Sequence, residues 1–451
     1  MQISSFKAYD VRGRIPDELN DEIAYRIGNA VVEYLGAKRV VVGRDIRESS
    51  VSISDAVIAG VTEAGADVLD IGLGGTEMVY FATGTLEADA GIMVTASHNP
   101  KDYNGLKIVR EGARPVSGDS GLVDIRALAE RDSRFTVTHA GRCDDCDVYD
   151  RYVQRLLSFT DRSALRPLKI VANPGNGGAG LVVDRLAPHL PFELDRLHFE
   201  PDGSFPNGVP NPMLESNRLA TAERVQSIGA DLGIAWDGDF DRCFFFDHNG
   251  RFIDGYYIVG LLAESMLVNE SAARVVYDPR VIWNTEEVVA RLGGTPVMSK
   301  SGHSFIKEVM RREDAIYGGE MSAHQYFRDF FYCDTGMVPW LLVAQIISTT
   351  GRSLANLVDA RIAAFPTSGE INRQVADVAA TIQRVRDHYE AEALSVVTVD
   401  GVSLSFADWR FNLRASNTEP VIRLNVETRG DAALLGARTS DLLELIGGTP
   451  G

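Results

Sequence analysis

The chain has 451 residues, of which 45% are apolar and 24% charged, a composition typical of a globular protein with about three or four domains. Lysine and arginine total 45 against 63 aspartates and glutamates, and the formal net charge of −18 argues against nucleic acid or an anionic membrane as the general partner. An anionic substrate would need a cationic pocket that is built locally.

The sequence predicts neither a signal peptide nor a membrane-spanning segment. Met1–Gly28 lacks the charged-then-apolar pattern of a signal peptide, and the longest apolar stretch, Met337–Ile347, is too short to span a bilayer. The four cysteines are widely spread, which fits a reduced compartment rather than a disulfide framework. We therefore expect a cytoplasmic protein.

Short β-branched segments recur along the chain, each followed by a polar or glycine-containing turn and a segment of helical period. This alternation predicts layered α/β domains, in which ligands bind beyond the carboxyl ends of the strands. The predicted strands include Arg39–Val42, Ile92–Thr95, Lys169–Ala172, Leu232–Trp236, Pro296–Met298 and Ile316-Tyr317.

The first turn with reactive side chains is Thr95–Pro100, which follows a predicted strand. Pro100 restricts the backbone before it and favours a rigid turn, so Ser97 is expected at the edge of the sheet as a candidate nucleophile. His98 could position phosphate oxygens. Taken alone, the same segment could be an ordinary polar turn.

Lysine is rare in this chain, with seven lysines and, by difference from 45, thirty-eight arginines. Lys107 is a candidate proton donor or acceptor, because lysine can lose its proton and arginine cannot. The pair Cys143 and Cys146 has metal-like spacing, but no second Cys or Cys/His pair completes a zinc site, which favours an ordinary loop. Asn173–Gly178 fits neither phosphate-binding glycine motif and is interpreted as a packing turn.

The most acidic turn contains Asp237, Asp239 and Asp241, at i, i+2 and i+4, after a predicted strand. Such spacing directs the carboxylates to one face of an extended loop, and oxygen-only ligands suit Mg²⁺. An EF-hand is excluded because its required glycine and glutamate positions hold Arg242 and His248. The alternatives are an acidic turn between two strands and, since a strand leads into Asp-x-Asp, an aspartyl nucleophile.

Two later turns offer groups for binding a sugar phosphate. In Gly318–His324 the glycines allow close approach of a ligand, and Glu320 with Ser322 could bond sugar hydroxyls, although a tight solvated turn fits equally. Arg414–Pro420 combines a guanidinium with hydroxyl, amide and backbone donors that suit a phosphate, against the alternative of a polar turn.

The last part of the chain has a different pattern, which predicts a small α+β domain. Closely spaced strands are expected at Ser395–Val399, Ser403–Phe406, Trp409–Leu413 and Ile422–Glu427, with one helix over Asp431–Ile446. Pro366–Gly369 is predicted to be the linker before this domain.

The four site segments together resemble the signatures of the α-D-phosphohexomutase superfamily, in order along essentially the whole chain: Thr95–Pro100, Asp237–Arg242, Gly319–His324 and Arg414–Pro420. Within the superfamily the chain is most similar to bacterial phosphomannomutases of the GDP-mannose pathway. That similarity lies in Phe6–Gly13, Asn104–Pro115, Tyr277–Asn284, Met298–Ile306 and Tyr317–Pro339.

The resemblance implies three α/β domains with mixed sheets and a smaller C-terminal α+β domain around a central cleft. We expect the boundaries to give domains 1–147, 148–250, 251–366 and 367–451, with one signature each. The resemblance also implies that Ser97 is phosphorylated at rest and that one Mg²⁺ is held by Ser97, Asp237, Asp239 and Asp241. Mannose 6-phosphate and mannose 1-phosphate would interconvert through a bound hexose 1,6-bisphosphate.

Further site residues follow from the same correspondence. Lys107, Arg12 and His303 are the candidates for proton transfer, while Arg280 stays charged as an arginine, which argues against such a role there. The remaining expected groups for catalysis or for binding substrate are His98, Arg242, Tyr9, Arg280, Glu320, Ser322, Arg414, Ser416, Asn417 and Thr418.

Several alternatives stay open at this point. Met321 favours mannose or glucose phosphates over glucosamine phosphates by family pattern, so a phosphoglucomutase or a dual-specificity mutase is the main alternative. An aspartyl-nucleophile phosphatase and a non-catalytic sugar-phosphate-binding protein are the others. We expect small hexose phosphates as partners, no nucleic acid or membrane, and a monomer or weak homodimer.

Overall fold

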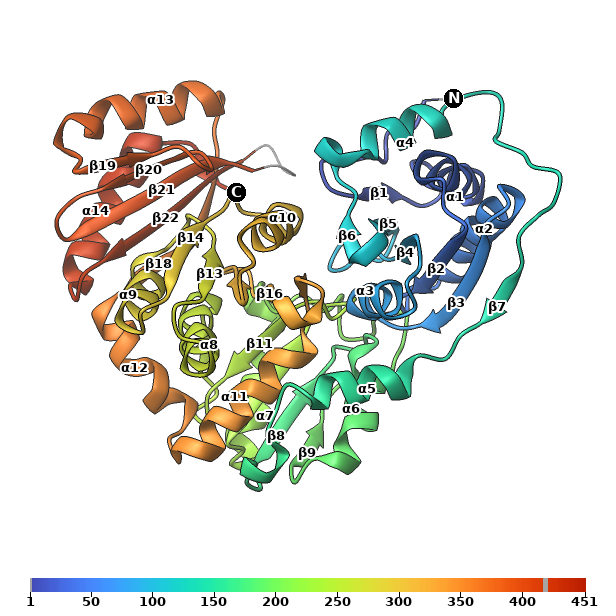
Figure 1. Ribbon diagram of the computed structural model, residues 1–451. Coiled ribbons are helices and arrows are strands. Elements are labelled where there is room, and N and C mark those ends of the chain that lie inside the picture. Colours follow the sequence, from blue (N-terminus) through green and yellow to red (C-terminus); the bar gives the residue numbers. More distant parts are fainter. Residues whose placement is uncertain (1, 417–420) are drawn as a thin grey trace. The chain divides into compact units, whose positions relative to one another are not determined.

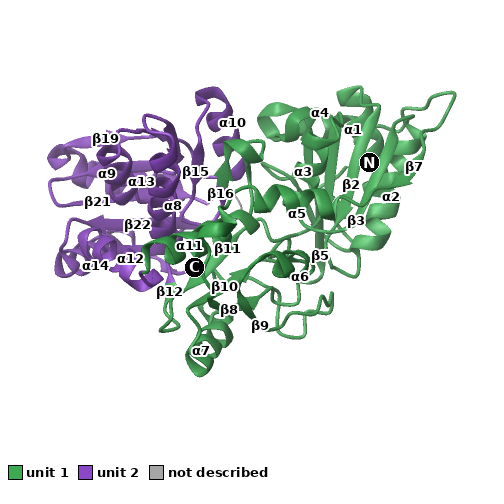
Figure 2. Ribbon diagram, turned by 60° about the horizontal axis from the view of Figure 1, so that its bottom comes forward, with its two compact units in different colours: residues 1–252, 326–351 green, residues 253–325, 352–451 purple. Residues whose placement is uncertain are grey.

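The computed structural model describes residues 2–416 and 421–451, which form two compact units. The first unit contains Met1–Phe252 and Tyr326–Gly351, and the second contains Ile253–Gln325 and Arg352–Gly451 (Figure 2). Each unit is built from helices packed on sheets, so the two are described separately.

The first sheet of the first unit is mixed, with the strand order β1-β5-β4-β2-β3-β7 and β6 beside β5 (Figure 1). Strands β2, β3 and β4 are parallel, whereas β5 is antiparallel to β4. The strands are β1 (Val11–Arg14), β2 (Arg39–Arg44), β3 (Asp67–Leu73), β4 (Ala90–Val94), β5 (Tyr103–Arg110), β6 (Arg114–Pro115) and β7 (Cys143–Asp145).

Helices on this sheet bury its valine-rich strands, which explains why β2 and β4 are apolar along nearly their whole length. Helix α1 begins after Asn20, whose side chain accepts a hydrogen bond from the Ile23 amide, and ends at Gly36 in the left-handed conformation. The helices are α1 (Asp21–Leu35), α2 (Ser50–Glu63), α3 (Thr76–Thr85) and α4 (Leu122–Ala129).

The second sheet of this unit has the order β12-β11-β10-β8-β9 and is also mixed. Its buried central strand β10 is parallel to β8 and antiparallel to β11, so the turn from β10 to β11 lies at the carboxyl end of β10. The strands are β8 (Lys169–Asn173), β9 (Glu193–Arg196), β10 (Leu232–Trp236), β11 (Cys243–Phe246) and β12 (Phe252–Ile253). The helices of this region are α5 (Tyr149–Leu157), α6 (Ala179–Leu186), α7 (Leu219–Ile228) and α11 (Met337–Thr350).

The second unit begins with three parallel strands in the order β14-β13-β15. They are β13 (Arg274–Tyr277), β14 (Thr295–Met298) and β15 (Tyr317–Gly319), and the helices around them are α8 (Gly255–Asn269), α9 (Trp283–Arg291), α10 (His303–Glu313) and α12 (Leu354–Ala364). The chain then forms the antiparallel pair β16 (Gln325–Phe327) and β17 (Cys333–Asp334), which belongs to the first unit from Tyr326 onward.

The last sheet, also in the second unit, is antiparallel with the order β19-β20-β21-β22-β18-β23. Phe411, Leu413 and Leu424 are among the side chains of its apolar core. The elements are β18 (Thr367–Gln374), α13 (Val378–Tyr389), β19 (Ser395–Val397), β20 (Val402–Ser405), β21 (Trp409–Ala415), β22 (Ile422–Thr428), α14 (Ala432–Ile446) and β23 (Thr449–Pro450).

This architecture confirms the predicted fold class of α/β domains with mixed sheets and a smaller α+β domain at the carboxyl end of the chain. The predicted linker Pro366–Gly369 is wrong, because Thr367 opens β18, which pairs with β22 through a local register shift. The polar residues of β18 are half-buried in a sheet and resemble a linker by composition alone.

Two smaller predictions also need correction. Gly318 and Gly319 belong to β15 rather than to a turn, since both are buried and pair with β13. Cys143 lies in the short edge strand β7 rather than in a loop, and all four cysteines are free thiols. Among the described residues no helix combines the length and the apolar character that crossing a membrane requires.

Candidate active site

Ser97 lies in the turn between β4 and β5 of the first unit, and its side chain is buried. Its φ of 50° is in the left-handed region, which residues other than glycine seldom adopt. The Ser97 hydroxyl donates to Asp237 Oδ2 at 2.8 Å and lies 3.0 Å from His98 Nδ1. Two predicted motifs 140 positions apart therefore meet at this hydroxyl.

Asp237, Asp239 and Asp241 lie in the turn that follows β10, and all three are buried. Each offers a carboxylate oxygen within 4.8 Å of the others. Burial, reinforced by the two neighbouring carboxylates, raises the pKa of Asp237 to about 6. Asp239 Oδ1 is buried with no hydrogen-bond partner in the described part of the chain, which fits an oxygen-ligated Mg²⁺ at this position.

Lys107, on β5, brings a cation to this acidic group. Its Nζ donates to Asp239 Oδ2 and to Asp241 Oδ2, both at 2.6 Å, and lies 3.3 Å from Thr76 Oγ1. Burial opposes a charge on the Lys107 amine, but the two carboxylates outweigh it and raise its pKa. Burial also opposes a charge on Asp239 and so tends to raise its pKa, but the charge and the hydrogen bond of Lys107 lower that pKa.

Arg242 is a second buried cation, and it reaches both the carboxylate and the serine. Its Nε and one terminal nitrogen donate to Asp237 Oδ2 at 3.0 and 2.7 Å, and the same terminal nitrogen lies 3.4 Å from Ser97 Oγ. That nitrogen also contacts His98 Nδ1. Burial, together with the charges of Arg242 and Arg12, holds the pKa of His98 well below its ordinary value, so the imidazole is neutral.

Arg12 supports the serine turn from β1. Its guanidinium donates to Asp10 Oδ2 at 2.8 Å, to the Ala96 carbonyl at 3.4 Å and to the side chain of Asn99. Tyr9, in the bend before β1, is half-buried. The first unit thus brings together Ser97 and those predicted catalytic and metal-binding residues that belong to this unit.

The second unit collects the predicted sugar-binding residues around Arg280, which follows β13 and is buried. Arg280 donates to Asp278 at 2.8 and 2.9 Å, to Ser322 Oγ at 3.2 Å and to Glu320 Oε1 at 3.4 Å. Glu320 also accepts from the Gly302 amide at 2.8 Å. His303 begins α10, with its Nδ1 3.5 Å from Lys307 Nζ.

Arg414, at the end of β21, meets an acidic partner that the sequence did not indicate. Glu370 on β18 accepts from Arg414 at 2.8 Å and from Arg423 at 3.1 Å, and it lies 3.6 Å from Arg280. The Ser416 amide donates to the Val421 carbonyl at 2.9 Å. The other two predicted phosphate-binding residues, Asn417 and Thr418, lie outside the described residues.

Two site residues were missed by the sequence analysis. Thr76, at the start of α3, donates to Asp239 Oδ2 at 2.5 Å, and the glycine pair before it was the only available signal. Glu370 offered no signal, because it lies in a polar strand and acquires its arginine partners only through the pairing of β18 with β22.

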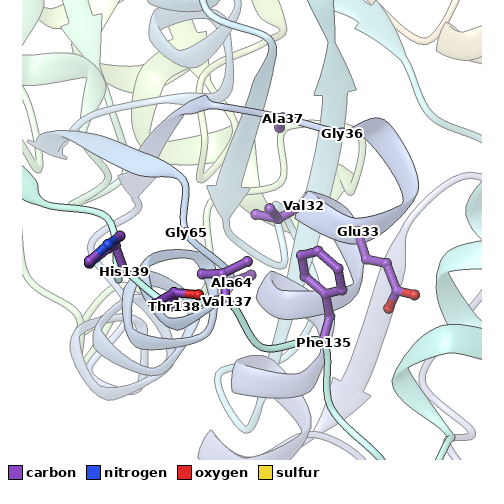
Figure 3. A pocket seen from close by; sticks show the side chains of 10 residues that line it. All are labelled: Val32, Glu33, Gly36, Ala37, Ala64, Gly65, Phe135, Val137, Thr138 and His139. Atoms are coloured by element: carbon purple, nitrogen blue, oxygen red, sulfur yellow. The ribbon is translucent and has the colours of Figure 1, made fainter.

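A hollow lies at the ends of α1 and α2 (Figure 3). Val32, Phe135 and Val137 make it largely apolar, and the carboxylate of Glu33 is paired with Arg131.

Comparison with known proteins covers nearly the whole chain. Residues 4–133, 150–250 and 254–365 match the α/β/α domains I, II and III of phosphoglucomutase/phosphomannomutase, and residues 370–444 match its C-terminal domain. The chain is 57% identical over 452 residues to "Phosphohexose mutases" of Xanthomonas campestris pv. campestris (strain B100), covering 99% of this chain and 100% of that protein.

Other relatives agree with this assignment. The chain is 56% identical to the phosphomannomutase of Escherichia coli (strain K12), covering 99% of both chains. A crystal structure of a phosphoglucomutase/phosphomannomutase family protein from Burkholderia thailandensis superposes with a TM-score of 0.88 at 32% identity, covering 100% of both chains. The resemblance drawn from the four sequence motifs is confirmed, and the chain belongs to the phosphoglucomutase/phosphomannomutase family.

Proposed function

We propose that the protein is a phosphomannomutase that interconverts mannose 6-phosphate and mannose 1-phosphate through a phosphorylated Ser97 and so supplies GDP-mannose synthesis. As a member of this family it is an isomerase that transfers a phosphoryl group within its substrate. The observation that carries the proposal is the Ser97 hydroxyl, 2.8 Å from Asp237 Oδ2 and beside two further aspartates and Arg242.

In this proposal Asp237, Asp239 and Asp241 hold one Mg²⁺ next to Ser97. When bound, the ion would neutralise charge on the oxygens of the transferring phosphoryl group. Arg242 would donate hydrogen bonds to the same oxygens, since its guanidinium already reaches Ser97 Oγ. The neutral imidazole of His98 would be a further phosphate-site partner.

The reaction consists of two phosphoryl transfers. In the first, the bond between Ser97 Oγ and phosphorus breaks as a sugar hydroxyl of the hexose phosphate bonds to phosphorus and loses its proton, which gives the hexose 1,6-bisphosphate. In the second, after the bisphosphate has turned over in the site, the bond between its other phosphorus and the sugar oxygen breaks as Ser97 Oγ bonds to that phosphorus, and the sugar oxygen regains a proton. Lys107 and His303 are the candidates for moving the proton of the sugar hydroxyl, whereas Arg12, the third predicted residue, stays charged and would donate a hydrogen bond to the sugar oxygen.

Substrate recognition is assigned to residues of the second unit. Glu320 and Ser322 would read sugar hydroxyls, with Tyr9 from the first unit as a further predicted contact. Arg280 and Arg414 would bind the phosphate that is not reacting, together with Ser416, Asn417 and Thr418. Both arginines are buried and cationic, so they provide the local positive charge that a protein of net −18 must build for a phosphorylated sugar.

The phosphoenzyme is tested by intact mass and peptide mapping of the purified protein after exposure to glucose 1,6-bisphosphate and Mg²⁺. We expect one phosphate on Ser97 and none in Ser97→Ala. A labile acyl phosphate on Asp237 with an unmodified Ser97 would instead support the aspartyl-nucleophile alternative. If no hexose phosphate is interconverted under these conditions, the protein is a non-catalytic sugar-phosphate-binding protein.

Substrate preference is tested by comparing kcat/KM for mannose 1-phosphate and glucose 1-phosphate. A higher value for mannose 1-phosphate is expected, and equal values would replace the phosphomannomutase assignment by a dual-specificity mutase. We further propose that the enzyme acts in the cytoplasm as a monomer or weak homodimer, and sedimentation with and without substrate checks the oligomeric state.

A further inference from the structure

Arg47 lies in the turn after β2 of the first unit, and only 2% of it is exposed. Its two terminal nitrogens donate to four backbone carbonyls, three in the serine turn between β4 and β5 and one at Tyr103, the first residue of β5. One reaches the carbonyls of Pro100 at 2.8 Å and Tyr103 at 3.0 Å, and the other reaches those of Ser97 at 2.9 Å and Asn99 at 2.7 Å. A single buried guanidinium therefore connects both ends of the turn that carries the nucleophile.

The Arg47 side chain is itself held in place. Its Nε lies 3.4 Å from Asp45 Oδ2, and Asp45 is fixed by the Ser50 hydroxyl at 2.6 Å and by the Arg47 amide at 3.0 Å. The ring of Phe205 stacks against the guanidinium at 5.4 Å. These contacts orient the guanidinium before any substrate binds.

The backbone at Ser97 needs such support. Its left-handed conformation is costly for a residue with a Cβ atom and persists only where the surroundings hold it. The Ser97 amide donates to Thr95 Oγ1 at 2.8 Å, and the Ser97 carbonyl accepts a hydrogen bond from Arg47. Arg47 thus supplies the donor on the carbonyl side of the strained residue.

We propose that Arg47 is a positioning residue of the reaction: by holding the serine turn through its carbonyls, it keeps Ser97 Oγ aligned with the metal-binding aspartates. This inference rests on the proposed role of Ser97. Arg47 touches backbone oxygens of the turn, so its effect on phosphoryl transfer passes through the position of Ser97. Lysine cannot replace it, because an ammonium lacks the planar fork that spans four acceptors.

The experiment compares Arg47→Ala and Arg47→Lys with Val42→Ala, a change in the buried core of β2 that leaves the site residues untouched. Melting temperature, kcat, KM and the rate of Ser97 phosphorylation by glucose 1,6-bisphosphate are measured, and Mg²⁺ affinity is measured by calorimetry with the metal alone. Both Arg47 variants should lose kcat and phosphorylation rate on the order of 100-fold, the size expected for a misplaced reacting group. Their KM and Mg²⁺ affinity should stay within about threefold of the wild-type values, because the affected group is the serine.

Chemical rescue separates positioning from general destabilisation. Guanidinium chloride at low, non-denaturing concentration should restore at least part of the Arg47→Ala phosphorylation rate by filling the vacated space, and it should not accelerate Val42→Ala. If Arg47→Ala does not fold, Arg47→Lys decides the question through its kcat at unchanged KM.

Two results would count against the inference or its premise, and they differ. Arg47 variants that lose only thermal stability, as Val42→Ala does, and keep the wild-type kcat overturn the positioning role. A wild-type protein that never carries phosphate on Ser97 refutes the proposed function itself.

Discussion

At the scale of single residues, the site around Ser97 is a set of buried charges that neutralise one another. Lys107 donates to two aspartates and Arg242 donates to the third. Isolated charges of this kind would be very costly to bury, so each depends on its partner. The role of Lys107 as a proton carrier stays a prediction, while its ion pairs with the carboxylates have consequences for stability that can be measured separately.

Lys107→Met should destabilise the protein by about 3 kcal/mol in the absence of divalent metal, because it leaves Asp239 and Asp241 without their buried cation. Magnesium can supply the missing charge, so it should stabilise Lys107→Met more than it stabilises the wild type. Thermal unfolding in EDTA and in saturating Mg²⁺ measures both effects. An equal loss of stability in the two buffers would mean that Lys107 does not neutralise the aspartates.

Gly238→Ala should impair catalysis by pushing the aspartate loop away from the serine. A Cβ atom at position 238 would lie 2.4 Å from the Ser97 carbonyl oxygen, a distance at which the backbone has to move. We expect a loss of about 1–3 kcal/mol in stability and a fall in kcat on the order of 100-fold.

The matched control for Gly238→Ala is Gly436→Ala, in α14, where an added Cβ meets no atom within 4 Å. That change should leave kcat unchanged and stabilise the helix by up to about 1 kcal/mol. A wild-type kcat in Gly238→Ala would contradict the tight contact between the two loops.

The residues that sequence reasoning found are those whose chemistry is visible locally. Three alternating aspartates indicate a cation site, and a serine in a turn after a strand indicates a candidate nucleophile, so their meeting at Ser97 and Asp237 could be anticipated with the help of a family resemblance. Arg47 could not be found in this way, because its partners are backbone carbonyls 50 to 56 positions later in the chain. Nothing in the sequence distinguishes it from other arginines.

At the scale of elements, helix α3 links the turn that holds Asp239 to a buried carboxylate. Thr76 at its start donates to Asp239, and the next residue, Glu77, is buried and accepts from the Tyr152 hydroxyl, the Thr335 hydroxyl and the Gly336 amide. Burial raises the pKa of Glu77 from an ordinary 4.5 to about 8, against the opposing effect of these donors. The start of α3 is therefore a place where ionisation and stability are linked.

As the pH rises, the free energy of unfolding of Glu77→Gln should increase progressively relative to that of the wild type. A carboxyl group whose folded pKa is raised contributes its full stability below the unfolded pKa, near 4.5, and loses it as pH rises through the folded pKa, near 8. Glutamine has no proton to lose. The difference in unfolding free energy, variant minus wild type, should therefore increase by a few kcal/mol across this window, since each unit of pKa shift corresponds to about 1.4 kcal/mol.

Urea unfolding at several pH values from about 5 to about 8.5 measures this difference, and metal-site titrations cancel because they occur in both proteins. Glu87→Gln, at an exposed position just beyond α3, is the matched control for losing one carboxyl group and should show no such trend. A difference for Glu77→Gln that is flat across the pH range would mean that Glu77 is ionised throughout, stabilised by its donors.

Strands with a continuous apolar run were predicted closely, whereas a polar strand that depends on pairing with its neighbours was not. Leu232–Trp236 is the strand that its apolar run indicates. The start of β18, Thr367–Gly369, was mistaken for part of a linker because its residues are polar and half-buried, and it becomes a strand through its pairing with β22. The arginine partners of Glu370 were hidden for the same reason.

At the scale of the whole molecule, the predicted site residues are divided between the two units. The three aspartates and Ser97 belong to the first unit, and Arg280, Glu320 and Arg414 belong to the second. The first unit is also discontinuous, since Tyr326–Gly351 returns to it and α11 supplies buried side chains such as Trp340 and Leu341. A ligand that binds only residues of the first unit should therefore stabilise that unit and leave the stability of the second unchanged.

We expect calorimetry to resolve two thermal transitions, one for each unit, and to show that Mg²⁺ alone raises only the transition of the first unit. Two core variants assign the transitions: Val42→Ala should lower the one that belongs to the first unit, and Leu413→Ala the one that belongs to the second. Mg²⁺ at 100 times its dissociation constant contributes about 2.7 kcal/mol, which corresponds to a rise of roughly 5 °C for a unit of this size. Asp239→Asn should abolish that rise.

Glucose 1,6-bisphosphate should raise the second transition, because the proposed reaction assigns one of its phosphates to Arg280 and Arg414. Arg414→Ala provides the decisive comparison: it should remove the effect of the bisphosphate on the second transition and leave the effect of Mg²⁺ on the first intact. If Mg²⁺ alone raised both transitions in the wild type, metal binding would involve the second unit, and the assignment of the ion to the three aspartates would be incomplete.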